Sequence, residues 1–180
     1  MRNLALAAAA AALAVALYAA GHYWNSRTIP NRQPATTTAA ESALPDLALT
    51  DLNGEKLNTA SYKGKVVVVN FWAAWCGPCT AEIPRFMALQ RKYSRQGLQV
   101  IGISIDDVPG QLRAFYRKLK MNYPVVPGGE KTADAYGGVL GLPTTFVIGR
   151  EGRLRAKYEG STDFKKLEHE ITALLNGTPR

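Results

Sequence analysis

Two cysteines, Cys76 and Cys79, are the residues of this 180-residue chain with the most distinctive chemistry, and the sequence contains no others. A disulfide between residues three apart closes too small a loop to serve as a structural crosslink. Tetrahedral zinc would need two more ligands, and neither histidine, His22 or His169, has a partner at ligand spacing. The pair is suited instead to thiol–disulfide exchange, in which one thiolate attacks a disulfide and a second thiol resolves the mixed disulfide. We therefore expect no metal and no cofactor beyond a redox-active Cys76–Cys79 disulfide.

The residues around the cysteines predict a strand that delivers them to the start of a helix. Val66–Phe71 is an apolar, β-branched run, typical of a central strand buried on both faces. A helix is expected from about Cys76 to Ser94, with a kink at Pro84. Cys76 would then lie where unpaired N–H groups and the helix dipole stabilise a thiolate.

The order of the cysteines along this helix predicts their roles. The thiolate is the nucleophile in disulfide exchange, and the start of a helix favours its formation. Cys76 is therefore predicted to attack the substrate disulfide, and Cys79, about one turn further on, to resolve the mixed disulfide. Gly77 and Pro78 form the tight turn and begin the helix, without a side chain that would crowd the incoming sulfur.

The stretch Trp75-Cys76-Gly77-Pro78-Cys79 resembles the active-site sequence of the thioredoxin superfamily. Gly141-Leu142-Pro143-Thr144-Thr145 precedes a predicted strand, and Pro143 resembles the cis-proline of that superfamily. The resemblance implies that Pro143 faces the cysteine turn and that the backbone of Leu142 pairs with the substrate chain. The substrate-binding residues expected on this basis are Trp75, Gly77, Pro78, Leu142 and Pro143.

Three further features resemble the TlpA/ResA-type branch, which contains membrane-tethered thioredoxin-like proteins. The chain opens with an apolar segment and a tether, and Asn70 stands where cytosolic thioredoxins have a buried aspartate. An extra helix–strand–helix segment, Gln111 to Tyr136, comes between the second strand and Pro143. The resemblance covers about Pro45 to Leu175.

Glu82 is the candidate for proton transfer, because Asn70 cannot accept a proton as a carboxylate does. Glu82 lies three residues after Cys79, on the same side of the predicted helix. In ResA-type proteins a glutamate at this place lies near the active site, which implies a catalytic residue that tunes Cys79 or moves its proton. A solvent-facing carboxylate is the alternative. Trp72 either joins Trp75 in an apolar contact surface or packs in the core.

The remaining sequence predicts an α/β thioredoxin fold, with a mixed central sheet flanked by helices on both faces. Asn53-Gly54 predicts a tight turn that joins Leu47–Leu52 to Glu55–Leu57 in an N-terminal hairpin. The other expected elements are the strand Leu98–Ile105, the helix Gln111–Lys120, the strand Tyr123–Val126, the helix Thr132–Tyr136, the hairpin of Thr144–Ile148 with Arg153–Tyr158, and a helix capped by Asp163 that ends near Leu175.

The N-terminal part predicts export. Leu4–Ala20 is an unbroken apolar run, which fits a signal anchor or a cleaved signal peptide over residues 1–24. Residues 25–44 are rich in Thr, Ala, Pro and Ser, as in a flexible linker, and residues 45–180 are the predicted thioredoxin-like domain. We expect a periplasmic or extracytoplasmic protein, tethered to the cytoplasmic membrane or secreted after cleavage.

The formal net charge of +8 is interpreted as a solvated basic surface, because no helix-turn-helix, zinc-finger or RNA-binding pattern indicates nucleic-acid binding. The resemblance implies a reductant of disulfide-containing exported proteins, in cytochrome c maturation or copper-oxidase assembly, that a membrane thiol electron donor keeps reduced. Three alternatives stay open: an extracytoplasmic thiol oxidase, a peroxiredoxin-like peroxidase and a non-enzymatic module that binds copper(I) through its thiolates.

Overall fold

The computed structural model describes residue 18, residues 48–105 and residues 109–177. Apart from residue 18, the predicted signal segment (1–24) and linker (25–44) lie outside this part of the chain. Within it, no helix combines the length and the apolar character needed to cross a membrane. The described residues 48–105 and 109–177 belong to one compact unit.

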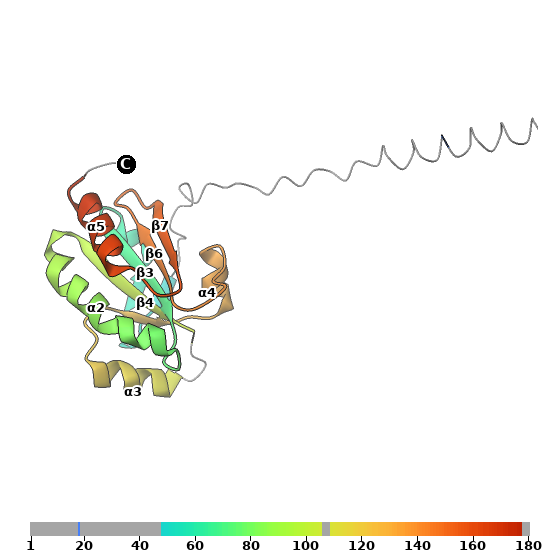
Figure 1. Cartoon of the computed structure of the whole chain (residues 1–180). Coiled ribbons are helices and arrows are strands. Elements are labelled where there is room, and N and C mark those ends of the chain that lie inside the picture. The colour runs from blue at the N-terminus through green and yellow to red at the C-terminus, as the bar shows by residue number, and fades with distance from the viewer. Residues whose placement is uncertain (1–17, 19–47, 106–108, 178–180) are drawn as a thin grey trace, which may run out of the picture. The chain divides into compact units, whose positions relative to one another are not determined.

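A five-stranded sheet forms the centre of the domain, with the strands in the order β5 (Val125–Pro127), β4 (Leu98–Ser104), β3 (Val66–Trp72), β6 (Thr144–Ile148) and β7 (Leu154–Glu159) (Figure 1). β3 pairs in parallel with β4 and antiparallel with β6, so the sheet is mixed, as predicted. Every residue of β3 is buried, which agrees with its continuous apolar sequence. This central strand leads directly to the two cysteines.

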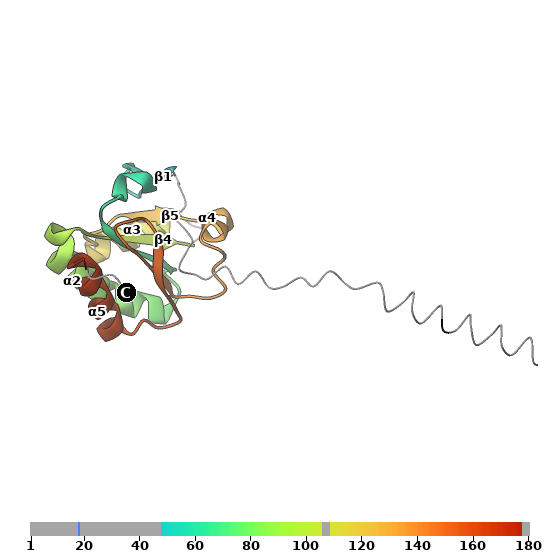
Figure 2. The ribbon, with the colours of Figure 1, turned by 90° about the horizontal axis from the view of Figure 1, so that it is seen from above.

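Helices cover both faces of the sheet. One face packs against α2 (Gly77–Tyr93), α3 (Pro109–Leu119) and α5 (Phe164–Leu175). The opposite face packs against the short helix α4 (Glu130–Ala135), the hairpin of β1 (Ala48–Thr50) and β2 (Lys56–Asn58), and the 3-10 turn η2 (Thr59–Tyr62). Figure 2 shows β1 and the pair α2 and α5 on opposite sides of the sheet. A second 3-10 turn, η3 (Ser94–Gln96), follows α2, and α2 runs through Pro84 without interruption.

The predicted N-terminal hairpin is present, but the prediction of a two-residue turn is wrong. Thr50 is paired with Lys56, so residues 51–55 form the loop. The reason is the carboxylate of Asp51, which accepts hydrogen bonds from the backbone N–H groups of Asn53 and Glu55, both at 2.8 Å. A local side-chain bond of this kind competes with a tight turn for the same backbone groups.

The predicted insertion between the second strand and Pro143 is confirmed, because α3, β5 and α4 lie between β4 and β6 in the chain. Its boundaries differ slightly from the expected ones. α3 begins at Pro109 and α4 at Glu130, each two residues earlier than predicted. Proline is well tolerated in the first turn of a helix, which explains the earlier start of α3.

Candidate active site

The two cysteines form a disulfide at the junction of β3 and α2, with their Cα atoms 5.3 Å apart. Cys76 is the N-cap residue of α2, and its Sγ accepts a hydrogen bond from the backbone N–H of Cys79 at 3.3 Å. Cys76 is 7% exposed, whereas Cys79 is fully buried. The outer sulfur is therefore that of Cys76, and the N–H that it accepts would stabilise its thiolate after reduction.

The turn that carries Cys76 is held by short-range backbone bonds. The N–H of Cys76 donates to the carbonyl of Ala73, and its own carbonyl accepts from Thr80, which begins the helical hydrogen-bond pattern. Gly77 and Pro78 are exposed, and a Cβ at Gly77 would meet no atom within 4 Å. The space beside the turn is thus open to an incoming chain.

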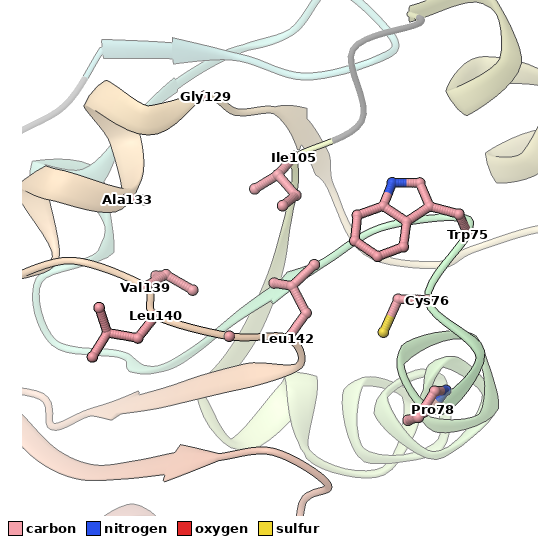
Figure 3. A pocket seen from close by; sticks show the side chains of 10 residues that line it. Trp75, Cys76, Pro78, Ile105, Gly129, Ala133, Val139, Leu140 and Leu142 are labelled. Carbon is pink, nitrogen blue, oxygen red and sulfur yellow. The ribbon is translucent and has the colours of Figure 1, made fainter.

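A cis peptide bond joins Leu142 to Pro143, as the resemblance implied. Pro143 is buried and directly precedes β6, whereas Leu142 is half-buried. Figure 3 shows the Sγ of Cys76 on the side of the turn that faces the Leu142 segment. The two segments that the sequence identified separately therefore lie beside each other.

An apolar groove of about 680 Å³ lies between the cysteine turn and this loop (Figure 3). Its edges carry two large exposed side chains, Trp75 at 72% and Leu140 at 96% exposure. The residues that line it are Trp75, Cys76, Pro78, Ile105, Gly129, Ala133, Val139, Leu140, Gly141 and Leu142. Three predicted substrate-binding residues, Trp75, Pro78 and Leu142, thus share one surface with Cys76, and exposed apolar side chains of this kind are typical of a contact surface.

The sequence did not identify Ile105, Val139 and Leu140 as residues of this surface. Val139 and Leu140 directly precede the Gly141–Thr145 segment, but nothing in their residue types indicates a contact surface. Ile105 follows β4, far from both motifs in sequence, and only the fold brings it to the groove. No local pattern marks them.

Glu82 is buried in α2, with 6% exposure, so the solvent-facing alternative is wrong. Its Oε1 accepts the backbone N–H of Thr162 at 2.5 Å, and its Oε2 accepts the Thr162 hydroxyl at 3.2 Å. Thr162 lies between β7 and α5, 80 residues from Glu82 in sequence, and no pattern in the sequence indicates this contact.

Burial raises the pKa of Glu82 above its ordinary value, because desolvation disfavours the charged carboxylate. Three contacts act in the opposite direction: the backbone N–H of Thr162, the hydroxyl of Thr162 and the charge of Arg85. Glu82 is thus a buried carboxyl group that lies one helical turn from Cys79. The protonated and charged forms of Glu82 lie closer in energy at neutral pH than those of an exposed glutamate. This is the property needed by a group that exchanges protons during catalysis.

The raised pKa predicts how stability depends on pH in the oxidised protein, where the cysteines do not titrate. The folded state holds the Glu82 proton to a higher pH than the unfolded state does, so the free energy of unfolding falls as pH rises from about 4.5 through the raised pKa. The variant Glu82→Gln should lack this loss. Urea unfolding of both proteins from about pH 4 to about pH 8 measures the difference, and parallel curves would contradict the assignment.

Trp72 belongs to the core and not to the contact surface. It is fully buried, and its ring lies 5.7 Å from that of Phe115 in α3. The indole also lies against Gly102 of β4, where a Cβ would come within 2.9 Å of Nε1. Of the two tryptophans near the cysteines, only Trp75 is available to a substrate.

Asn70 is buried in β3 and donates from Nδ2 to the hydroxyl of Thr145 at 3.0 Å.

His169 is exposed on α5 beside lysines. In the part of the chain that the structure describes, no three His, Cys, Asp or Glu side chains are grouped as a metal site requires.

Comparison with known proteins agrees with this site. The sequence model of the AhpC/TSA family matches residues 40–157. The thiol–disulfide oxidoreductase ResA of Bacillus subtilis (strain 168) is 36% identical over 136 residues, which cover 74% of this chain and 74% of that protein. The chain belongs to this thioredoxin-like family, among the ResA-type thiol–disulfide oxidoreductases. The predicted enzyme class is thereby confirmed, and the non-enzymatic copper module loses its support.

Solved structures confirm the thioredoxin fold. A thiol:disulfide interchange protein of the thioredoxin family from Chlorobium tepidum is similar with a TM-score of 0.69 and 27% identity, over 74% of this chain and 96% of that one. A secreted thiol-disulfide isomerase from Corynebacterium glutamicum is similar with a TM-score of 0.68 and 25% identity, over 74% of this chain and 85% of that one.

Proposed function

We propose that this ResA-type protein reduces disulfides in exported proteins, with Cys76 as the attacking residue and Cys79 as the resolving residue. The observation that carries the proposal is the difference between the two sulfurs: that of Cys76 lies at the helix start beside an apolar groove, and that of Cys79 is buried behind it. A substrate disulfide reaches only the first, and the second is held in place to resolve the adduct.

The reaction balances as a two-electron exchange. The Cys76 thiolate attacks one sulfur of the substrate disulfide, and the other substrate sulfur leaves as a thiolate that takes up a proton. Cys79 then gives its proton to the Glu82 carboxylate and attacks Cys76, which forms the Cys76–Cys79 disulfide and releases the second substrate sulfur as a thiolate. This thiolate takes up a proton from solvent, and Glu82 later returns its proton to solvent. The substrate is reduced and the enzyme is oxidised.

The groove supports a protein substrate that presents an extended apolar segment next to its cysteine. Trp75 and Leu140 would contact that segment, and the backbone of Leu142, next to cis-Pro143, would pair with it. Gly77 and Pro78 would leave room for the sulfur. The substrates we propose are exported proteins whose cysteines must be reduced before they receive haem or copper. A membrane thiol electron donor would return the enzyme to its dithiol form.

We also propose that the protein acts outside the cytoplasm, held at the membrane by residues 1–24 or released after their cleavage. The apolar sequence of this segment supports the proposal, as does the similarity to a secreted protein. Fractionation of cells that express the full chain, with protease treatment of intact spheroplasts, tests it. A protein that stays protected inside the cytoplasm would contradict it.

The direction of electron flow is tested by the reduction potential. Equilibration of the protein with glutathione buffers should give a two-electron potential nearer to that of thioredoxin, about −270 mV, than to that of DsbA, about −120 mV. The dipeptide Gly77-Pro78 between the cysteines supports the lower value. A potential near that of DsbA would instead make the protein a thiol oxidase, and steady consumption of peroxide by the dithiol would make it a peroxidase.

A further inference from the structure

Four buried polar side chains form a continuous hydrogen-bonded chain from the middle of the sheet to the active-site helix. Asn70 of β3 donates to the Thr145 hydroxyl of β6 at 3.0 Å, and the hydroxyls of Thr145 and Thr162 lie 3.2 Å apart. The Thr162 hydroxyl donates to Glu82 of α2 at 3.2 Å. Their exposed fractions are 1% for Asn70, 0% for Thr145, 9% for Thr162 and 6% for Glu82.

The chemistry of these groups gives the chain a direction. The amide N–H of Asn70 is only a donor, so it fixes the hydroxyl oxygen of Thr145 as an acceptor. The single hydroxyl proton of Thr145 is then free to point to Thr162, and that of Thr162 points to the Glu82 carboxylate. Every proton in the chain is directed toward Glu82.

The opposite direction is disfavoured by the same geometry. A protonated Glu82 that donated to Thr162 would turn the Thr162 hydroxyl toward Thr145. The Thr145 oxygen would then accept from both Thr162 and Asn70, and its own proton would have no acceptor within the chain of four. A buried donor left without a partner is costly, so the fixed amide at one end favours the accepting form of the carboxylate at the other.

We propose that Asn70 and Thr145 are positioning residues for this enzyme: they orient the two threonine hydroxyls toward Glu82 and keep its carboxylate ready to accept the proton of Cys79. The inference rests on the proposed role of Glu82 in the resolving step. Asn70 thus acts on the active site through two hydroxyl groups and without touching the cysteines or the substrate.

Other charges around Glu82 do not replace this chain. On α2 itself, Arg85 lies near the carboxylate and favours its charged form, while its guanidinium lies over the Phe164 ring at 4.4 Å. On the neighbouring loop, the Asp163 carboxylate accepts the backbone N–H groups of Lys165 and Lys166 and caps α5. The groups that the sheet contributes to the hydrogen-bonded chain, Asn70 and Thr145, are neutral.

The test combines a titration with a rate measurement. In the oxidised full chain, carbon-13 NMR of the Glu82 side-chain carboxyl gives its titration midpoint. Thr145→Val removes the hydroxyl at nearly constant volume and should move that midpoint upward by about 0.5–1 pH unit, the size expected for the loss of one oriented hydrogen bond. Thr145→Ser should restore it. Thr172→Val is the matched control, because that hydroxyl bonds only to carbonyls of α5.

The pH profile of the resolving step should move with the midpoint, as measured by release of a model peptide from its mixed disulfide with Cys76. Asn70→Leu, a second variant that lacks the donor, covers the case in which Thr145→Val fails to fold. An unchanged midpoint in the folded variants would overturn the proposed orientation of the threonine hydroxyls toward Glu82. A shifted midpoint with an unshifted rate profile would overturn the proposed link between this orientation and catalysis. Failure of the proposed function is distinct: the wild-type protein itself would then reduce no disulfide.

Discussion

Replacement of Cys76 by serine should lower the rate of disulfide reduction by at least about 1,000-fold, because a hydroxyl cannot form the mixed disulfide on which the reaction depends. The structure makes this a clean test. Cys76 is the N-cap of α2, and serine is one of the best N-cap residues, so Cys76→Ser keeps the helix start intact. The loss therefore reports on chemistry and not on folding.

The measurement is turnover of a protein disulfide such as that of insulin, with dithiothreitol as the electron source. The control is urea unfolding of Cys76→Ser and of the reduced wild-type protein, which should agree within about 1 kcal/mol because neither contains the disulfide. Retention of a tenth or more of the activity would show that another group attacks the substrate. It would also remove the basis for the assignment of Cys79 as the resolving residue.

Replacement of Phe86 by alanine should lower the free energy of unfolding by about 3–5 kcal/mol, the range for loss of a large buried aromatic side chain. Phe86 is fully buried in α2, and its ring meets that of Phe164 at 5.0 Å in an edge-to-face arrangement. Phe164 begins α5 directly after the Thr162 segment that holds Glu82. The expected loss is a large part of a typical domain's stability, and it arises from packing next to the Thr162 segment that binds Glu82.

Urea unfolding of the oxidised proteins measures this loss. Arg91→Ala, an exposed position on the same helix, is the matched control and should change stability by no more than about 0.5 kcal/mol. Equal stability of Phe86→Ala and Arg91→Ala would contradict the packing described for α2 and α5.

The sequence predicted the parts of the site whose signals are local. A β-branched run, a Cys-Gly-Pro-Cys turn and a helix follow one another without interruption, so the position of Cys76 at the helix start could be derived from the sequence alone. Pro143 could be placed because its resemblance to a cis-proline is carried by neighbouring residues. The mixed sheet followed from the alternation of strands and helices.

The contacts that the sequence could not predict are those made across the fold. Glu82 and Thr162 are 80 residues apart, and Asn70 and Thr145 are 75 apart, so no spacing rule connects them. The sequence also did not indicate which side of the sheet each residue of β3 faces. When every position of a strand is buried, the usual alternation of apolar and polar residues is absent, which is why Trp72 could not be assigned to the core.

The prediction of the hairpin turn was wrong because it took no account of one side-chain contact. Asn53-Gly54 is a strong signal for a two-residue turn, and Gly54 does adopt a positive φ of 89°. The carboxylate of Asp51 nevertheless binds the backbone of the loop and fixes a longer connection. Composition identified the turn, but one side chain determined its length.

Trapping of the mixed disulfide distinguishes the roles of the two cysteines, with Cys76 as the residue that attacks the substrate and Cys79 as the residue that resolves the adduct. The variant Cys79→Ser, reduced and then mixed with a peptide disulfide, should accumulate a stable one-to-one mixed disulfide, and digestion with mass spectrometry should place the peptide on Cys76. Absence of any adduct, at a peptide concentration at which the wild-type protein turns over, would show that Cys76 does not attack the substrate disulfide.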